Sequence, residues 1–420
     1  MRGKIEIFRK IDVTTILLYL FLVFFGWLNI YASMYNDDMT SSIFDLSTKY
    51  GKQLLFICIS LLLAFIIILI DWRFFNTLAF IFYGITIFAL IAVLFTEKVG
   101  GSTSWFPIGN YKIQPSEFAK FTTSLALAKM LSLNKKNFFS FKSMIKSYTI
   151  LLVPFLLIIL QNDMGTALVF TSFILVFYRE GLSGNVLIIG LVIFSLILFS
   201  LMIPAWIVAV IFTSLIFVIY YFRSSRTRSI KISSVIAIIS IGIICSTDYL
   251  YNNLLADHQQ ERINIFIGKD FDPQNSGYNL IQSKIAVGSG GFFGKGFLNG
   301  TQTRFDFVPE QSTDFIFCTV GEEWGFLGSL IFLIAFSSLL FRIIFLAEKQ
   351  KSQFCRIYGY CVASILFIHL IINIGMTIGL APTIGIPLPF MSYGGSSLIS
   401  FTILLFIFLN LNSYRMEILR

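Results

Sequence analysis

The residues with the clearest capacity for chemistry lie between Gly288 and Gly328, in the stretch GSGGFFGKGFLNGTQTRFDFVPEQSTDFIFCTVGEEWGFLG. This stretch is rich in glycine, although the chain around it is strongly apolar. Ionisable groups near a membrane are costly unless they are paired or functional. Chemistry is therefore expected among its five acids, which are Asp306, Glu310, Asp314, Glu322 and Glu323.

Asp314 stands immediately before a long apolar run. Its carboxylate could cap the helix that follows. It could also act as a general base. Burial raises the pKa of such a carboxylate and a helix dipole lowers it, and the sequence leaves open which effect is larger. Glu322 and Glu323 fall about two turns deeper and are interpreted as structural acids, either paired or protonated. Asp306 and Glu310 are assigned to the loop surface.

A second candidate lies in the segment GGSTSWFPIGNYKIQPSEFAK, which ends at Lys120. Pro115 and Ser116 predict a helix start, and Glu117 would complement its N-terminal dipole. Lys120 follows three residues later on the same helical face, so the two side chains can pair. The pair either stabilises a capped helix or lines a polar cavity at membrane depth. Trp105 suits a membrane interface.

The turn Gln161–Thr166 interrupts two apolar runs and carries Asp163. This acid either caps the next helix or faces an outer cavity. Arg262 and Lys295 could contact a phosphate, although the glycines around Lys295 do not have phosphate-loop or dinucleotide-binding spacing. In the segment PTIGIPLPFMSYGGSS, three prolines break a helix, and Ser392 and Tyr393 offer hydroxyl groups. The candidate substrate-binding residues are Trp105, Asp163, Arg262, Lys295, Glu310, Ser392 and Tyr393.

Composition identifies the elements that must position these residues. The chain has 420 residues, of which 56% are hydrophobic and 13% charged, and its mean hydropathy is +0.83. A soluble core could not bury that much apolar surface, so the fold class is an all-α, polytopic membrane bundle. The net charge of +9 arises in short loops between apolar runs, which indicates membrane topology and excludes nucleic acid as a partner.

About twelve crossings are expected, because a span needs about 20 apolar residues. The stronger candidates are residues 14–34, 53–70, 74–95, 186–203, 231–248, 315–345, 355–380 and 391–411. Shorter or more polar candidates are residues 117–132, 147–161, 164–180 and 205–221. A long outer loop is expected over residues 249–314, with apolar stretches at Ile263–Ile267 and Tyr278–Val287 that could form interfacial helices.

The basic residues predict the orientation, because Lys and Arg concentrate on the cytoplasmic side. Twelve spans would place all the strong basic loops on one side, together with cytoplasmic N- and C-termini. Those residues are Arg2, Lys4, Arg9, Lys10, Lys135, Lys136, Lys142, Lys146, Arg223, Arg226, Arg228, Lys231, Lys349, Lys351, Arg415 and Arg420. The candidate site would then face outward from the cytoplasmic, or inner, membrane.

These segments, in this order, resemble the SEDS family of bacterial cell-wall polymerases, RodA and FtsW. The resemblance covers most of the chain outside residues 182–257, and the GTQ at residues 300–302 is similar to the RodA branch. The pieces that carry it are GGSTSWFPIG, QPSEFAK, QNDMGTA, HQQERI, GYNLIQSKIAVGSGGFFGKGFLNGTQ, FVPEQSTDFIFCTVGEEWGFLG and GIPLPFMSYGGSS.

The resemblance implies a peptidoglycan glycosyltransferase that polymerises lipid II outside the cytoplasmic membrane during cell elongation. Asp314 matches the family's essential aspartate, and Glu117 and Lys120 match its conserved pair, so these three are the expected catalytic residues. Asp163 matches the acid of the family's outer turn. A class B penicillin-binding protein and the elongation proteins MreB, MreC and MreD are the implied partners. A divalent cation, Mg²⁺ or Mn²⁺, is a possible cofactor whose ligands the sequence leaves open.

The chain departs from the family in two places. Asn162 stands where the family has proline, which predicts a looser turn with Asp163 still in place. The family has ten spans, so residues 182–257 are expected to carry two extra helices within a single domain over residues 1–420. The alternatives to the polymerase are a lipid II flippase, a division polymerase of the FtsW type and a non-catalytic scaffold, because broken helices and buried acids also suit transporters.

Overall fold

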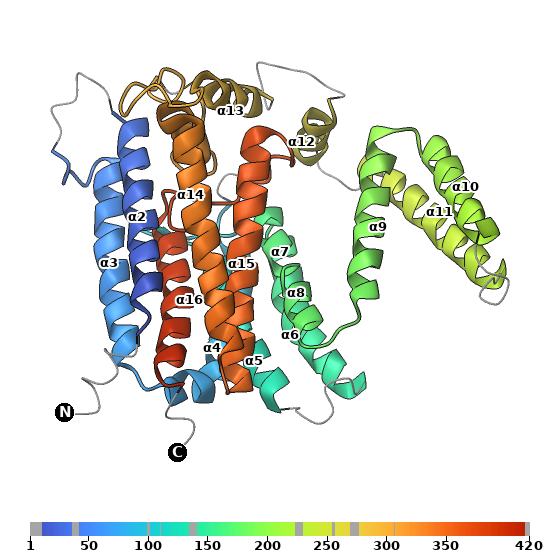
Figure 1. The fold of residues 1–420 in the computed structure, drawn as a ribbon, viewed down its shortest axis with the longest axis horizontal. Coiled ribbons are helices and arrows are strands. Elements are labelled where there is room, and N and C mark those ends of the chain that lie inside the picture. The colour runs from blue at the N-terminus through green and yellow to red at the C-terminus, as the bar shows by residue number, and fades with distance from the viewer. Residues whose placement is uncertain are drawn as a thin grey trace. The chain divides into compact units, whose positions relative to one another are not determined.

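The computed structural model describes residues 11–35, 42–98, 101–109, 111–133, 141–222, 230–253, 257–268, 277–305 and 307–415. Almost all of its secondary structure is helical (Figure 1). The first elements in chain order are α2 (Val13–Ser33), α3 (Lys49–Leu69), α4 (Trp72–Ala92), η1 (Val93–Phe95), β1 (Phe106–Ile108), β2 (Tyr111–Ile113), α5 (Pro115–Leu133), α6 (Phe141–Leu160), α7 (Met164–Phe170) and α8 (Phe173–Arg179). There follow α9 (Gly184–Met202), α10 (Ala205–Phe222), α11 (Ile230–Asn253), α12 (Asp257–Ile267), α13 (Tyr278–Ser289), α14 (Ile316–Glu348), α15 (Gln353–Ile378) and α16 (Gly395–Ser413).

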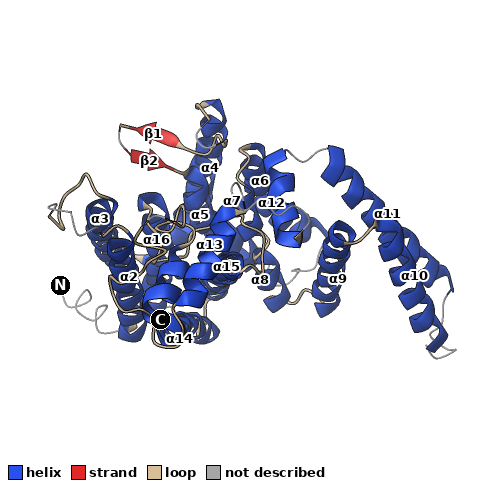
Figure 2. Ribbon diagram, turned by 90° about the horizontal axis from the view of Figure 1, so that it is seen from above, coloured by secondary structure: helices blue, strands red, loops and turns tan. Residues whose placement is uncertain are grey.

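The all-α prediction is confirmed at the level of fold class. The two strands form one short antiparallel hairpin, which pairs Phe106 with Ile113 (Figure 2). Several helices start where a short polar side chain caps their free N–H groups, as Asp12 does for α2, Thr48 for α3 and Asp71 for α4. Such caps satisfy backbone donors that have no partner within the helix.

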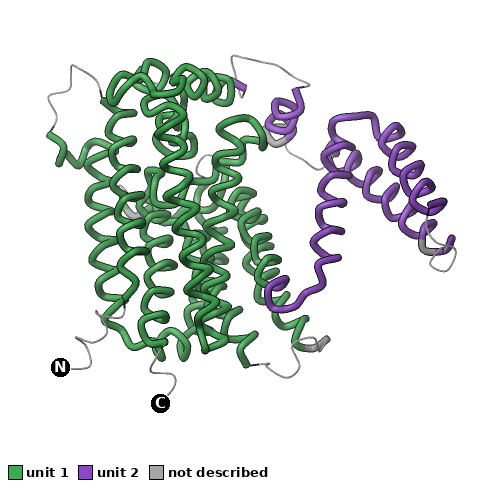
Figure 3. Tube along the Cα trace, in the orientation of Figure 1, with its two compact units in different colours: residues 1–176, 278–420 green, residues 177–277 purple. Residues whose placement is uncertain are grey.

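The chain divides into two compact units (Figure 3). Unit 1 comprises residues 1–176 and 278–420, and unit 2 comprises residues 177–277. In unit 1, α14 packs on α2 and α15, while α16 packs on α3. In unit 2, α9, α10 and α11 share a small core of Leu196, Val208 and Ile244. That two helices of residues 182–257 are an insertion stays a prediction.

Ten helices in the described part of the chain are long and apolar enough to cross a membrane, and the expectation of twelve is therefore wrong. All eight stronger candidates are among the ten, as are residues 147–161 and 205–221. The two that fail are 117–132 and 164–180. A multi-pass integral membrane protein follows from the ten that remain.

Each failure has a physical reason. Helix α5, which covers 117–132, buries Glu117, Lys120 and a run of hydroxyl residues among α4, α6, α15 and α16. A helix surrounded by other helices does not need a lipid-compatible surface. The segment Met164–Arg179 is too short, and α7 and α8 are separate helices of seven residues each.

The glycine-rich stretch packs closely against the first part of α14. Helix α14 contains a non-helical residue, Gly325 (φ +63°), where the backbone of Phe326 donates to Gly291. A Cβ on Gly294 would lie only 2.1 Å from the Glu323 carbonyl oxygen, so only glycine permits this approach. The glycines therefore pack the loop onto the helix.

The outer-loop prediction is tested only in part. The apolar stretches expected at Ile263–Ile267 and Tyr278–Val287 both lie in helices, α12 and α13. Residues 254–256, 269–276 and 306 of the predicted loop lie outside the described residues. So do many basic residues on which the predicted orientation depends: Arg2, Lys4, Arg9, Lys10, Lys135, Lys136, Arg223, Arg226, Arg228 and Arg420.

Candidate functional site

The predicted pair on α5 forms an ion pair inside unit 1. Lys120 Nζ lies 2.7 Å from Glu117 Oε2, and each of the two side chains is only 2% exposed. Ser400, on α16, donates a hydrogen bond of 3.2 Å to the same carboxylate oxygen. The spacing of three residues produced the predicted pairing, and its burial excludes a solvated surface bridge.

His369, on α15, completes this centre. Its Nε2 lies 3.2 Å from Lys120 Nζ, and its Nδ1 lies 3.0 Å from the Pro387 carbonyl oxygen. A carbonyl only accepts hydrogen bonds, so Nδ1 carries the proton and Nε2 accepts from the ammonium. The ammonium also lies 4.2 Å from the centroid of the Phe401 ring. We call Glu117, Lys120 and His369 the buried triad.

Asp163 connects the start of α5 to the start of α7. Its Oδ1 accepts from the backbone N–H of Thr166, which confirms the predicted helix cap. Its Oδ2 accepts from the side chains of Gln114 at 2.7 Å and Ser116 at 3.2 Å. Asn162 adopts φ 60°, a left-handed conformation that asparagine tolerates and proline cannot adopt.

Asp314 lies half-buried in the turn just before α14. Its backbone carbonyl accepts a 2.7 Å hydrogen bond from Asn373, which donates equally to the Ile386 carbonyl. Its carboxylate packs against Gly385, where an added Cβ would lie 3.2 Å from Oδ2. The backbone of Asp314 is therefore held by α15, and its side chain packs against the segment that follows α15.

Residues 384–388 connect the separate parts of the site, and we call them the hub segment. Pro387 receives the His369 hydrogen bond, while Gly385 contacts Asp314. Gly165, two residues after Asp163, packs against the same segment, since an added Cβ would lie 3.2 Å from the Gly385 carbonyl oxygen. The structure thus brings Asp314, Asp163 and the buried triad together around the hub segment.

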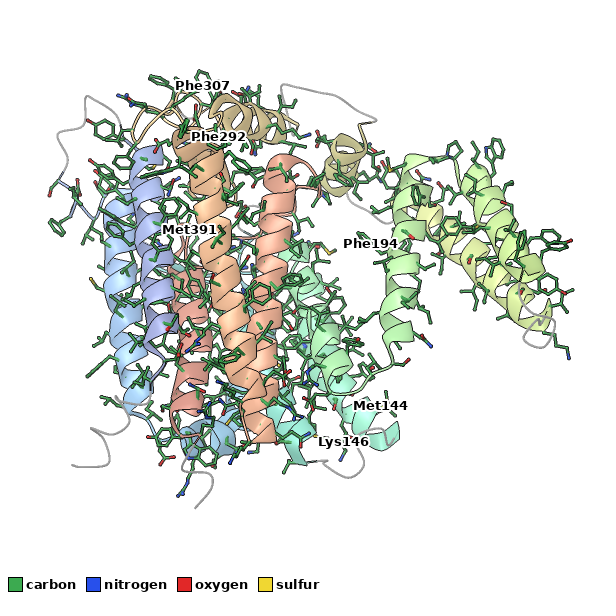
Figure 4. The ribbon with its side chains drawn as sticks, in the orientation of Figure 1. Met144, Lys146, Phe194, Phe292, Phe307 and Met391 are labelled. Atoms are coloured by element: carbon green, nitrogen blue, oxygen red, sulfur yellow. The ribbon has the colours of Figure 1, made fainter. Side chains whose placement is uncertain are left out.

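The serine and tyrosine of the proline-rich segment fix this arrangement. Ser392 Oγ donates to the Thr313 carbonyl at 2.6 Å and accepts from the Leu388 N–H at 2.8 Å. Tyr393 N–H donates to the Ser312 carbonyl at 2.8 Å. Met391, the residue before Ser392, is fully buried inside the bundle (Figure 4). The predicted substrate contacts of both residues stay predictions, and their observed contacts dock the hub segment on the Asp314 turn.

Within the described part of the chain, the remaining candidates form no hydrogen bond or ion pair with the buried triad. Lys295 pairs with Glu322 at 2.7 Å, and Glu310 is exposed and accepts from Thr313. Trp105 is half-buried and accepts from Thr96 through its carbonyl. Arg262 is exposed on α12 in unit 2. Substrate binding by these four residues stays a prediction.

The interpretation of Glu322 as a buried, paired acid is confirmed. Its two oxygens accept from the backbone N–H groups of Thr301, Gln302 and Thr303 and from Lys295. A carboxylate saturated by donors in this way is a structural clamp for the loop. Glu323 is also buried, and Asp306 lies outside the described residues.

The described residues do not form an all-protein metal centre, because no three His, Cys, Asp or Glu side chains within them are grouped for one. Magnesium is commonly held by one or two carboxylates together with substrate phosphates. A divalent cation at this site stays a prediction, and its ligands would have to include the substrate.

Sequence reasoning missed His369, Asn373 and Ser400. Each lies inside an apolar span and separately looks like an isolated polar residue. The available signal was the spacing of His369 and Asn373, four residues apart on one face of α15. Polar side chains within a span mark functional positions by default.

The fold and site define a polytopic membrane protein with a buried polar centre. A family model described as FTSW_RODA_SPOVE, cell cycle protein, matches residues 12–228 and 186–417. The chain therefore belongs to the SEDS family of FtsW, RodA and SpoVE, as its motifs predicted.

Individual relatives agree with this assignment. Peptidoglycan glycosyltransferase MrdB of Escherichia coli K12 is 33% identical over 319 residues, which are 76% of this chain and 73% of that protein. Peptidoglycan glycosyltransferase RodA of Treponema pallidum is 30% identical over 413 residues, or 92% and 94% of the two chains. A chain solved in a study of polymerization and crosslinking by a peptidoglycan synthase complex superimposes with a TM-score of 0.69 at 26% identity, covering 97% of this chain and 99% of that one.

Proposed function

We propose that this protein joins lipid II units into glycan strands, with Asp314 as the general base. The chain is a peptidoglycan glycosyltransferase of the SEDS family. The observation that carries the proposal is the position of Asp314, which is held beside Gly385 on the hub segment and in the turn that begins α14. A half-buried carboxylate at a span end can reach a substrate whose lipid tail remains in the bilayer.

The chemistry is a single displacement. Asp314 accepts the proton of the acceptor sugar's 4-hydroxyl as that oxygen bonds to the anomeric carbon of the donor. The bond from this carbon to the phosphate oxygen breaks, and undecaprenyl pyrophosphate leaves with the electron pair. The transition state is oxocarbenium-like by analogy with glycoside hydrolysis. Attack from the opposite face inverts an α-linked donor to a β-linked product.

The buried triad supports this reaction by positioning. The Lys120 ammonium is almost fully buried and already contacts Glu117 and His369. His369 in turn donates to the Pro387 carbonyl and so fixes the hub segment against which Asp314 packs. Direct contact between Glu117 or Lys120 and the substrate stays a prediction. Stabilisation of the leaving pyrophosphate by Lys120, Arg262 or a divalent cation is likewise a prediction.

The cellular role belongs to the same proposal. The GTQ at residues 300–302 favours elongation over division. A class B penicillin-binding protein is the proposed transpeptidase partner, with MreB, MreC and MreD as further components. The similarity to a chain solved in a peptidoglycan synthase complex supports a partner of this kind. The proposed location is the cytoplasmic membrane, with both termini in the cytoplasm and the site outside.

Purified protein reconstituted in vesicles with lipid II separates the candidate functions. The polymerase proposal predicts glycan product from the wild-type protein and none above background from Asp314→Ala. Lipid II that crosses the bilayer without being joined would instead identify a flippase. Equal product from both proteins would refute the role of Asp314. Product that forms only when the penicillin-binding partner is added, and equally with Asp314→Ala, would identify a scaffold.

A further inference from the structure

A cavity of about 510 Å³ lies between α4, α5 and α6, separate from the polar centre. Its walls are largely apolar and include Ile87, Met130, Ile150 and Val153. We propose that this cavity binds an acyl chain of an anionic glycerophospholipid, with the lipid phosphate held by Lys146. The proposal does not depend on the proposed function.

The cavity has open space beside Gly84 that could hold a lipid acyl chain. A Cβ added at Gly84, on α4, would meet no atom within 4 Å. Tyr83 beside it donates a 3.1 Å hydrogen bond to the Ile150 carbonyl, which ties α4 to α6. The two helices are therefore fixed to each other while the space beside Gly84 remains open.

Among the described residues that line this cavity, Lys146 is the only cation. Its side chain is exposed, and no hydrogen bond or ion pair joins it to another described residue. It lies three residues inside the apolar segment Ser143–Leu160, at the lower end of α6 in Figure 4. A lysine at that depth extends its ammonium to the headgroup level, where a phosphate would be its counterion.

The length of the cavity agrees with this assignment. Lys146 and Val153 line it seven residues apart, which is about 10 Å along a helix. One leaflet contributes about half of a hydrocarbon core that is about 30 Å thick. A chain running from Lys146 towards Val153 therefore stays within a single leaflet.

The charge of Lys146 selects the lipid class. Basic cavities between helices on the cytoplasmic side bind anionic headgroups. Lys146 lies at the same end of unit 1 as the start of α2 (Figures 1 and 4), which is the end that the basic-residue rule predicts to be cytoplasmic. A zwitterionic headgroup carries its own cation, so it gains less from Lys146. An anionic lipid such as phosphatidylglycerol is therefore the expected occupant.

The test measures lipid retention on the full-length protein by native mass spectrometry, with phosphatidylglycerol and phosphatidylcholine of identical chains. We expect the wild-type protein to retain phosphatidylglycerol preferentially and Lys146→Gln to reduce that preference about fivefold. Gly84→Phe should fill the cavity and reduce retention of both lipids.

Two matched controls are Lys231→Gln, an exposed lysine at the start of α11, and Gly190→Phe, where an added Cβ also meets open space. Both should behave as the wild-type protein does, and thermal unfolding should confirm that every variant is folded. Equal retention of the two lipids by the wild-type protein would overturn the proposal. So would a Gly84→Phe variant that retains both lipids normally.

Discussion

Replacing His369 with leucine tests whether the buried triad positions the hub segment. The substitution removes the acceptor for the Lys120 ammonium and the donor to the Pro387 carbonyl, at a site where His369 is only 1% exposed. Leucine leaves both partners without the hydrogen bonds they make in the folded protein. His369→Gln is the matched variant, because its amide can accept from Lys120 and donate to Pro387.

The structure sets the size of the effect. Hydrogen bonds to charged groups contribute about 1.5–3 kcal/mol, and neutral ones about 0.5–1.5 kcal/mol. Losing both therefore costs about 2–4.5 kcal/mol, which corresponds to about 30- to 2,000-fold if it falls on the transition state. The glutamine variant should recover at least half of this free energy, since it keeps both contacts in altered geometry.

The assay is the steady-state rate of lipid II polymerisation, with thermal unfolding measured on the same preparations. Positioning predicts a large fall in kcat with little change in KM for His369→Leu, and recovery of kcat in His369→Gln. Phe367→Leu is the control, because Phe367 lies on the same helix and is 40% exposed. A leucine variant within twofold of wild-type kcat would refute the reasoning, as would a glutamine variant no better than leucine.

Three further predictions follow from individual contacts. Glu322→Ala should leave several loop N–H groups without an acceptor, cost more than about 3 kcal/mol and make the glycine-rich loop sensitive to proteolysis, whereas wild-type resistance in the variant would contradict the clamp. Gly385→Ala should reduce kcat, because φ is +78° there and the new Cβ would lie 3.2 Å from Asp314 Oδ2; an unchanged rate would argue against this packing. Burial alone would raise the pKa of Asp12, but hydrogen bonds from Arg342 and Thr15 outweigh it and hold the pKa below its ordinary value of 3.8. The ionised Asp12 therefore stabilises the fold above about pH 3.8, and this stabilisation is lost as the pH falls further. Asp12→Asn should remove this part of the acid dependence of thermal unfolding. An acid profile identical to that of the wild type would disprove the contribution of Asp12.

Local features of the site were predictable from sequence, because they depend on residues a few positions apart. The three-residue spacing of Glu117 and Lys120 gave their pairing, and the position of Asp163 before an apolar run gave its cap. Both rules follow from helix geometry and free N–H groups at helix starts. Family motifs pointed to Asp314, and the structure adds its contact with Gly385.

Long-range features were not predictable in this way. His369 meets Lys120 across 249 positions of the chain, and no local pattern specifies that contact. The span count failed because hydropathy measures suitability for lipid, whereas α5 is enclosed by other helices. Lys295 illustrates a third difficulty, since a lysine in a glycine-rich loop looked available for phosphate but is paired with the buried Glu322.

The most direct test of the central claim is the single-turnover rate of glycan formation by Asp314→Asn. Asparagine keeps the size and packing against Gly385 but cannot act as a base at neutral pH. The account predicts a rate about 10²- to 10⁴-fold below wild type with normal thermal unfolding, while Asp248→Asn, an exposed acid on α11, retains the wild-type rate. An Asp314→Asn rate within a few-fold of wild type would contradict the assignment of Asp314 as the general base.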